Sequence, residues 1–240
     1  MSTPKVFLTE TYRKNAFIVG VLFIIATAFL FIGGAFYGPV LDTPDYLETA
    51  YPQRITATVG MLIEFTCVLA IPLIAVFAFP VLKQYNLPLA ISYIFFRAFE
   101  AVLFILVDIN KLALIPISKG YVNGTPAEAA FYKNLGDFII NWNMWGWVFY
   151  VLVFGIGALV LYSVLYRSRL LPRWISIFGL VAAVLITASA VLSMFEVGFN
   201  LPDGMFELIL VMPIAVQEMV MAVWLIVKGF NPSTRATLNK

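Results

Sequence analysis

Six long runs of apolar residues decide what this chain can fold into. An α-helix rises about 1.5 Å per residue, so about 20 apolar residues cross the roughly 30 Å hydrocarbon core of a bilayer. The runs lack the alternation of polar and apolar residues that is typical of the strands of a membrane barrel. They therefore predict six transmembrane helices, at residues 16–37, 55–81, 88–107, 138–166, 174–195 and 206–227.

The composition agrees with this interpretation. Of the 240 residues, 62% are hydrophobic and 12% are charged, and the mean hydropathy is +0.96. A soluble domain has about 25% charged residues. We expect an all-α, polytopic membrane helical bundle in which residues 1–240 form a single six-helix transmembrane domain. The first run is too long for a signal peptide and lacks a small-residue cleavage site, so we interpret it as a retained anchor.

The basic residues predict the orientation of the chain in the membrane. Under the predicted topology, most lysines and arginines lie on the side that holds both termini. Cytoplasmic loops of membrane proteins carry an excess of Lys and Arg, so both termini are predicted to be cytoplasmic. The richer side holds Lys5, Arg13, Lys14, Lys83, Arg167, Arg169, Arg173, Lys228, Arg235 and Lys240, and the other side holds Arg54, Lys111, Lys119 and Lys133.

Two segments carry local structural signals. In the predicted outer loop at residues 108–137, the sequence 125-TPAE-128 has the pattern of a capping box and predicts that a helix begins there and runs into the fourth span. In the fifth span, Gly179, Ala183 and Thr187 recur at a spacing of four residues, which predicts close packing against a neighbouring helix. The segment 54-RITATVG-60 resembles 173-RWISIFG-179. The sequence therefore leaves open whether the chain is built as a 3+3 inverted repeat.

Four ionisable residues fall within the predicted spans, at similar depths near the membrane midplane: Glu64, Arg97, Glu100 and Glu218. A charge that faces lipid there would cost about 2.5–3.5 kcal/mol. We therefore expect these side chains to face the interior of the bundle and one another. If all four ionise, three carboxylates outnumber one guanidinium, so a proton or a cationic ligand would restore the balance.

Further polar residues on the outer side suggest a pocket that opens outward. On the third span, Tyr93, Arg97, Glu100, Asp108 and Lys111 fall within a helical arc of about 80°. Asp108 and Lys111 also fit an ordinary solvated helix end, and Gln217 also fits a hydrogen bond between helices. The residues that we expect to line the pocket are Tyr93, Gly60, Asn141 and Gln217.

The residue inventory excludes several kinds of chemistry. The chain has no histidine and a single cysteine, Cys67, so it lacks the commonest metal ligand and general base and cannot form an intramolecular disulfide. We expect no cofactor, and the sequence does not identify a metal. Basic patches with interleaved aromatic residues are absent outside the spans, so we expect the lipid bilayer and a small ligand as partners rather than nucleic acid.

Four stretches resemble an uncharacterised prokaryotic membrane family, domain of unknown function 4386. They are 13-RKNAFIVGVLFII-25, 97-RAFEA-101, 166-YRSRLLPRWISIFGL-180 and 218-EMVMAVWLIVKGF-230, and the resemblance covers nearly the whole chain. It implies a multi-pass protein of the prokaryotic plasma (inner) membrane. The family supplies no established activity, so it assigns no functional residue.

Three functions fit these observations. The first is binding or translocation of a proton, cation or small polar ligand at Glu64, Arg97, Glu100 and Glu218. The second is a structural, accessory or sensory role in which the buried charges specify helix packing. The third is an intramembrane enzyme with two glutamates as acid and base on a lipid-like substrate, which is the least favoured, so we lean against an enzyme.

Overall fold

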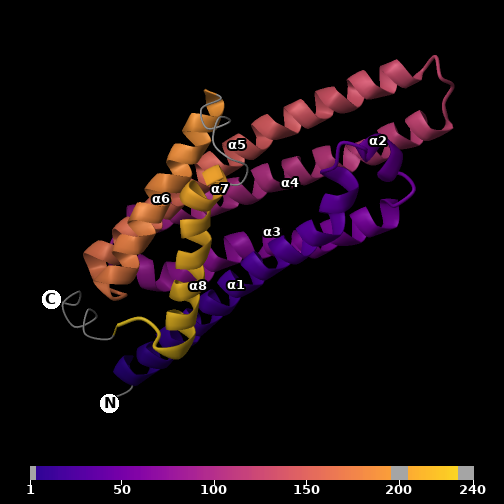
Figure 1. Cartoon of the computed structure of the whole chain (residues 1–240). Helices are drawn as coiled ribbons and strands as arrows, with labels where there is room; N and C mark the ends of the chain where they lie inside the picture. The colour runs from indigo at the N-terminus through magenta and orange to yellow at the C-terminus, as the bar shows by residue number, and fades with distance from the viewer. Residues whose placement is uncertain (1–3, 196–204, 232–240) are drawn as a thin grey trace. The chain divides into compact units, whose positions relative to one another are not determined.

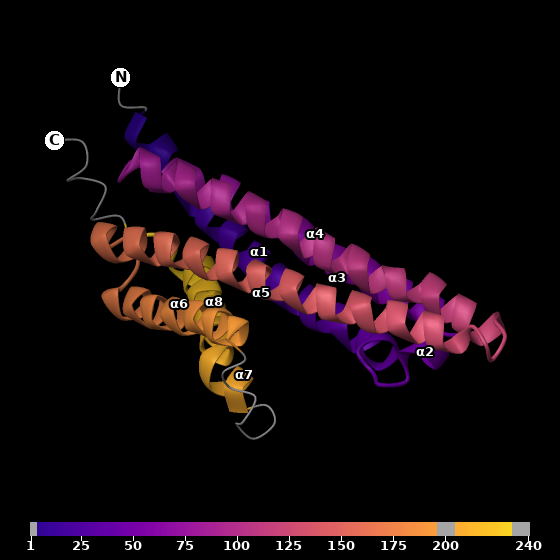
Figure 2. The same cartoon turned by 90° about the horizontal axis from the view of Figure 1, so that it is seen from above.

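The computed structural model describes residues 4–195 and 205–231, and these residues form helices joined by turns, without a strand (Figure 1, Figure 2). The all-helical fold that the apolar runs predict is therefore confirmed. Five of the described helices are long and apolar enough to cross a membrane. The helices are α1 (Pro4–Leu41), α2 (Tyr46–Thr49), α3 (Arg54–Leu82), α4 (Leu87–Asn123), α5 (Ala129–Ser168), α6 (Arg173–Met194), α7 (Met205–Leu210) and α8 (Met212–Val227).

The sixth apolar run differs from the prediction because it is divided between α7 and α8. Helix α8 has 16 residues, which gives a length of about 24 Å at 1.5 Å per residue. Pro213 lies in the first turn of α8 and explains the break. Proline has no N–H to donate, and its ring clashes with the carbonyl group four residues earlier in a continuous helix. A sixth span and the cytoplasmic position of both termini stay predictions.

Helices α4 and α5 are longer than the spans predicted for them. They contain 37 and 40 residues, about 55 and 60 Å at 1.5 Å per residue. Residues 108–123, expected as part of a loop, continue α4, because the buried side chains of Leu114 and Ile117 extend its packed face. The predicted helix start is confirmed, since α5 begins at Ala129, directly after the TPAE sequence.

The capping interaction at this helix start involves one carboxylate. Glu128 accepts hydrogen bonds from the Thr125 backbone N–H at 2.8 Å and from the Thr125 hydroxyl at 2.9 Å. These hydrogen bonds favour the ionised carboxylate and lower the pKa of Glu128. The same bonds fix the turn that precedes α5.

The chain forms two compact units, each assembled from separate segments. Unit 1 contains Met1–Ile25, Ala70–Glu100 and Val151–Lys240, and unit 2 contains Ala26–Leu69 and Ala101–Tyr150. Helices α1, α3, α4 and α5 each contribute residues to both units, whereas α6, α7 and α8 belong to unit 1 and α2 belongs to unit 2.

In unit 2, the backbones of α1 and α3 are in direct contact. A Cβ atom built on Gly33 would lie 2.7 Å from Glu64 Cβ and 2.8 Å from the Gly60 carbonyl oxygen. Helix α2 is tied to α4 by the Ser118 hydroxyl, which donates to the Leu47 carbonyl oxygen at 2.7 Å. The apolar core around these contacts contains Tyr37, Val40, Leu41, Tyr46, Leu47, Ala50, Ala57, Met61, Leu114 and Ile117.

In unit 1, the small-residue face predicted on the fifth span packs against α5. Gly179 lies directly against the ring of Tyr162, and Thr187 lies against Gly155. This contact confirms the prediction of close packing. Helix α6 also packs against α8. The Arg13 side chain of α1 donates to carbonyl oxygens in the last turn of α8 and so satisfies acceptors that the helix end leaves open.

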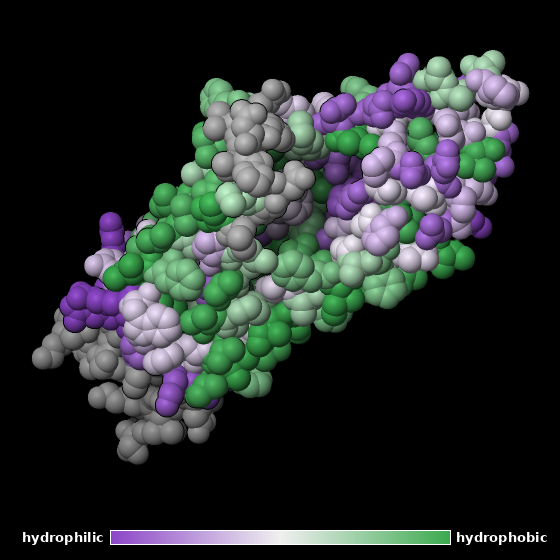
Figure 3. Space-filling model, viewed as in Figure 1, coloured by the Kyte–Doolittle hydropathy of each residue, from purple (hydrophilic) through white to green (hydrophobic). Residues whose placement is uncertain are grey.

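Large apolar side chains are exposed on the long helices of both units. Phe95 in unit 1 and Leu62 in unit 2 are 61% and 65% exposed. Such extensive apolar exposure is unfavourable in water and fits contact with lipid chains. In unit 2, hydrophilic side chains gather around α2 and the nearby ends of α4 and α5 (Figure 3). The described helices thus have the surface of an integral membrane protein.

Candidate functional site

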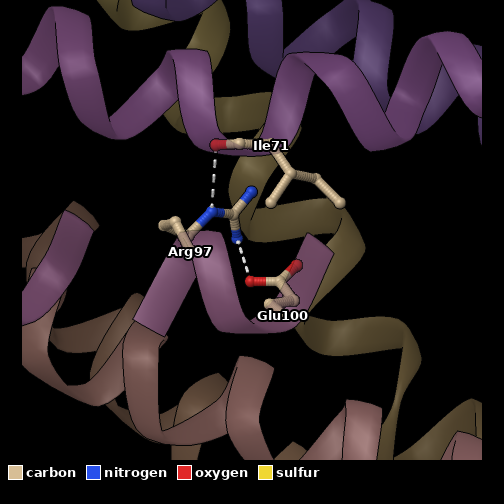
Figure 4. A network of polar contacts seen from close by, with 3 residues as sticks. All are labelled: Ile71, Arg97 and Glu100. Carbon is tan, nitrogen blue, oxygen red and sulfur yellow. Dashed lines mark hydrogen bonds and ion pairs between the residues drawn. The ribbon is translucent and has the colours of Figure 1, made fainter. Parts of the chain in front are cut away.

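Arg97 on α4 forms buried polar contacts with Ile71 of α3 and with Glu100 of its own helix (Figure 4). Its Nη1 lies 3.0 Å from Oε2 of Glu100, which is nearly one turn later on the same helix. Its Nε donates to the Ile71 carbonyl oxygen of α3 at 3.4 Å, and its guanidinium carbon lies 5.8 Å from the centroid of the Phe154 ring on α5. Arg97 and Glu100 are 4% and 1% exposed, so solvent screens their ion pair little.

Glu218 on α8 brings a second carboxylate to this network. Arg97 attracts Glu218, and the charges of Glu218 and Glu100 repel each other. Glu100 is buried, whereas Glu218 is only partly buried. We call Arg97, Glu100 and Glu218 the arginine cluster. If both of its acids ionise, the arginine cluster carries one net negative charge in a poorly hydrated place.

Tyr93 and Gln217, expected as pocket residues, have different surroundings in unit 1. Tyr93 is buried, its hydroxyl has no hydrogen-bond partner among the described residues, and it lines an apolar cavity of about 10 Å³. That volume is close to the minimum for one water molecule. Gln217 accepts a hydrogen bond from Tyr162 and donates to the Ile175 carbonyl oxygen at 3.2 Å. Gln217 therefore links α8 to α5 and α6, as the alternative interpretation of this residue expects.

Glu64 belongs to unit 2, and its hydrogen-bond and charge partners differ from those of the arginine cluster. The Tyr37 hydroxyl donates to Glu64 Oε1 at 3.0 Å. The carboxyl group of Asp108 lies within hydrogen-bonding reach of the Glu64 carboxyl group, and Lys111 is the positive charge that acts on both. The structure thus brings three of the four predicted ionisable residues together in unit 1 and gives Glu64 its own partners in unit 2.

The remaining predicted pocket residues, Gly60 and Asn141, also lie in unit 2. Gly60 is the close-contact position between α1 and α3, where a Cβ atom would lie 2.7 Å from Phe36 Cβ. Asn141 is exposed, and its Nδ2 donates to the Asp137 carbonyl oxygen at 2.8 Å. Across residues 4–195 and 205–231, no group of three or more His, Cys, Asp or Glu side chains is placed to hold a metal ion.

Sequence reasoning missed several partners of these charges. A helical wheel already placed Asp108 and Lys111 on the same face of α4 as Arg97, but the charged turn was also consistent with a solvated helix end. Tyr37 and the Ile71 carbonyl oxygen gave no signal, because a tyrosine or a backbone acceptor in an apolar run has no distinctive pattern. Only helix packing shows that they face charged side chains.

The fold and these buried networks define a polytopic helical integral membrane protein with ionisable residues inside its bundle. The sequence assigns it more closely: residues 18–229 match the family described as domain of unknown function 4386 (DUF4386), and the chain belongs to that family. The resemblance drawn from the four stretches is therefore confirmed. No curated protein matches the sequence, and no solved structure matches it either.

Proposed function

We propose that this membrane protein binds or translocates a proton, a cation or a small polar ligand at the arginine cluster. The observation that supports this most is the charge imbalance, since two carboxylates face one guanidinium in a buried setting. A net buried charge is costly, so uptake of a positive charge would stabilise the cluster. Packing alone does not require the second carboxylate.

The three residues have different roles in this proposal. Glu100 is held by Arg97 deep inside unit 1, whereas Glu218 is partly exposed and is the acid that a ligand reaches. Carboxylate oxygens suit protons and hard cations. Arg97 neutralises one of the two carboxylates when the ligand leaves, because its guanidinium stays protonated at any physiological pH.

The test is the thermal stability of the protein in lipid nanodiscs, measured by tryptophan fluorescence over a range of pH and sodium concentration. The parent protein should show a midpoint that depends on pH or sodium, and Glu218→Gln and Glu100→Gln should each weaken that dependence. Glu48→Gln is the control, because Glu48 is an exposed acid in unit 2. The proposal is wrong if both cluster variants respond as the parent does.

A structural role is the second candidate, and the contacts of Gln217 and Arg97 favour it. Both side chains bond to backbone carbonyl oxygens of neighbouring helices, as residues that specify helix packing do. In that case Arg97→Gln should prevent folding, and Glu218→Gln should leave every response to pH and sodium unchanged. The nanodisc measurements above therefore separate the two functions.

We further propose that both termini are cytoplasmic and that the polar residues open outward, in the plasma (inner) membrane of a prokaryote. The excess of basic residues on one side supports this orientation. In a Cys67→Ala background, Ala127→Cys should react with a membrane-impermeant maleimide in intact cells. Gln84→Cys should react only after permeabilisation. Both positions are exposed, so the reverse pattern would contradict the topology.

A further inference from the structure

Unit 2 contains a pair of buried carboxyl groups that do not belong to the arginine cluster. Glu64 on α3 is fully buried, Asp108 on α4 is 8% exposed, and their carboxyl groups lie within hydrogen-bonding reach of each other. Tyr37 donates to Glu64 Oε1. Glu64 Oε2 and Asp108 Oδ1 have no hydrogen-bond donor from any other group in the described part of the chain.

The chemistry of this pair requires a proton. An ionised carboxylate can only accept hydrogen bonds, so two ionised carboxylates in contact repel each other. A single shared proton turns one group into a donor and satisfies an oxygen of each residue. The Tyr37 hydroxyl then stabilises the remaining negative charge from the Glu64 side.

A cavity in unit 2 shares Lys111 with the surroundings of this pair. It has a volume of about 410 Å³, and its lining includes Asp42, Asn110, Lys111 and Asn143. A water molecule needs only about 10–15 Å³ of such volume. Asn143 Oδ1 is a further buried acceptor without a partner among the described residues, so a water molecule there would be bound.

Lys111 connects the cavity with the carboxyl pair. Lys111 lines the cavity, and its ammonium nitrogen lies 3.5 Å from Asp42 Oδ2 and 4.1 Å from the centroid of the Tyr37 ring. Its charge also acts on Glu64 and Asp108. The side chain is 14% exposed, so it is largely buried between the cavity and the pair on which its charge acts.

We propose that Glu64 and Asp108 form a proton-binding site that exchanges protons with the water of this cavity. The titratable or charged groups that face the pair are Tyr37 and Asp42, from α1 and the turn after it, and Lys111 from α4. Helix α5 contributes the uncharged Asn143 to the cavity. The site does not depend on the arginine cluster, and either proposal can fail without the other.

Infrared spectroscopy of the full-length protein in nanodiscs tests the site, because a protonated carboxyl group has its own carbonyl stretching band. The parent protein should show this band at neutral pH. Glu64→Gln and Asp108→Asn should each remove the pair's part of this band, because the amide donates the hydrogen bond that the shared proton made and a single ionised carboxylate remains. Glu48→Gln, the control, should keep the whole band, and Glu218→Gln should keep the part that the carboxyl pair contributes.

Three results would overturn the proposal. They are the absence of the band from the parent, an undiminished band in both pair variants, and complete loss of the band in Glu218→Gln. Tyr37→Phe gives an independent measurement should the pair variants not fold. Without the tyrosine hydroxyl, the ionised pair loses a donor, so the band should persist to higher pH than in the parent. An unchanged titration midpoint in Tyr37→Phe would also refute the site.

Discussion

Replacement of Arg97 by glutamine removes the cation of the arginine cluster, which faces the buried Glu100 and the partly buried Glu218. Glu100 is 1% exposed and its Oε2 lies 3.0 Å from Arg97 Nη1, so the variant leaves a buried carboxylate without its ion partner. Removal of one member of a buried ion pair costs about 3–5 kcal/mol. We expect Arg97→Gln to lower the free energy of unfolding by that amount.

The double variant Arg97→Gln/Glu100→Gln should recover much of this loss, because it removes both charges of the pair. The coupling energy between the two positions should be about 2–3 kcal/mol. The free energies of unfolding of Arg97→Gln, Glu100→Gln and the double variant are measured in mixed micelles of increasing denaturing-detergent content, with tryptophan fluorescence as the signal. Arg54→Gln is the control: this exposed arginine stacks on the Tyr51 ring at 4.7 Å, a contact that contributes about 0.5–1 kcal/mol.

The reasoning fails if Arg97→Gln costs less than about 1 kcal/mol, which is the range of an exposed ion pair. It also fails if the effects of the two single variants simply add in the double variant. Additivity would mean that the two side chains do not interact in the folded protein.

Two further predictions concern helix contact and helix capping. Gly33→Ala should destabilise the protein by about 1–3 kcal/mol, because the new Cβ atom would overlap α3. The control is Gly34→Ala, because a Cβ atom there would meet nothing closer than the Tyr37 hydroxyl oxygen at 3.8 Å. This variant should gain up to about 1 kcal/mol of helix propensity. If Gly33→Ala and Gly34→Ala change the stability equally in the same unfolding assay, the close contact at Gly33 is contradicted. The pKa of Glu128 is lowered in the folded state, so its stabilising contribution is present above the pKa of the unfolded chain and is lost as pH falls through the folded pKa. In an NMR titration, Thr125→Val should raise this pKa part of the way, since the backbone donor remains, and an unchanged value would exclude a role for the hydroxyl.

Several features of the fold could be predicted because their causes are local in sequence. A run of about 20 apolar residues must satisfy its backbone hydrogen bonds within itself in lipid, so the helices follow directly from the sequence. The TPAE turn and the small residues of α6 are equally local patterns, and both predictions are confirmed. Pro213 was also visible, but the uninterrupted hydrophobicity of the sixth run concealed the helix break that it causes.

The partners of the buried charges were not predictable in the same way. A helical wheel predicts that Arg97 and Glu100 share a face of α4, and their positions along the apolar runs predict similar depths for Glu64 and Glu218. Neither argument determines which helix lies opposite. Helix packing brings Glu218 near Arg97, and it brings Asp108 and Tyr37 near Glu64.

The sequence by itself determined that this chain is an all-helical membrane protein of the DUF4386 family, with ionisable residues inside its apolar runs. The tertiary structure decided how those residues are grouped: an arginine cluster in unit 1 and a carboxyl pair beside a cavity in unit 2. The physical reason is that helix formation in lipid depends on each segment alone. The energy of a buried charge depends on the side chains and carbonyl groups that other helices place within a few ångströms of it.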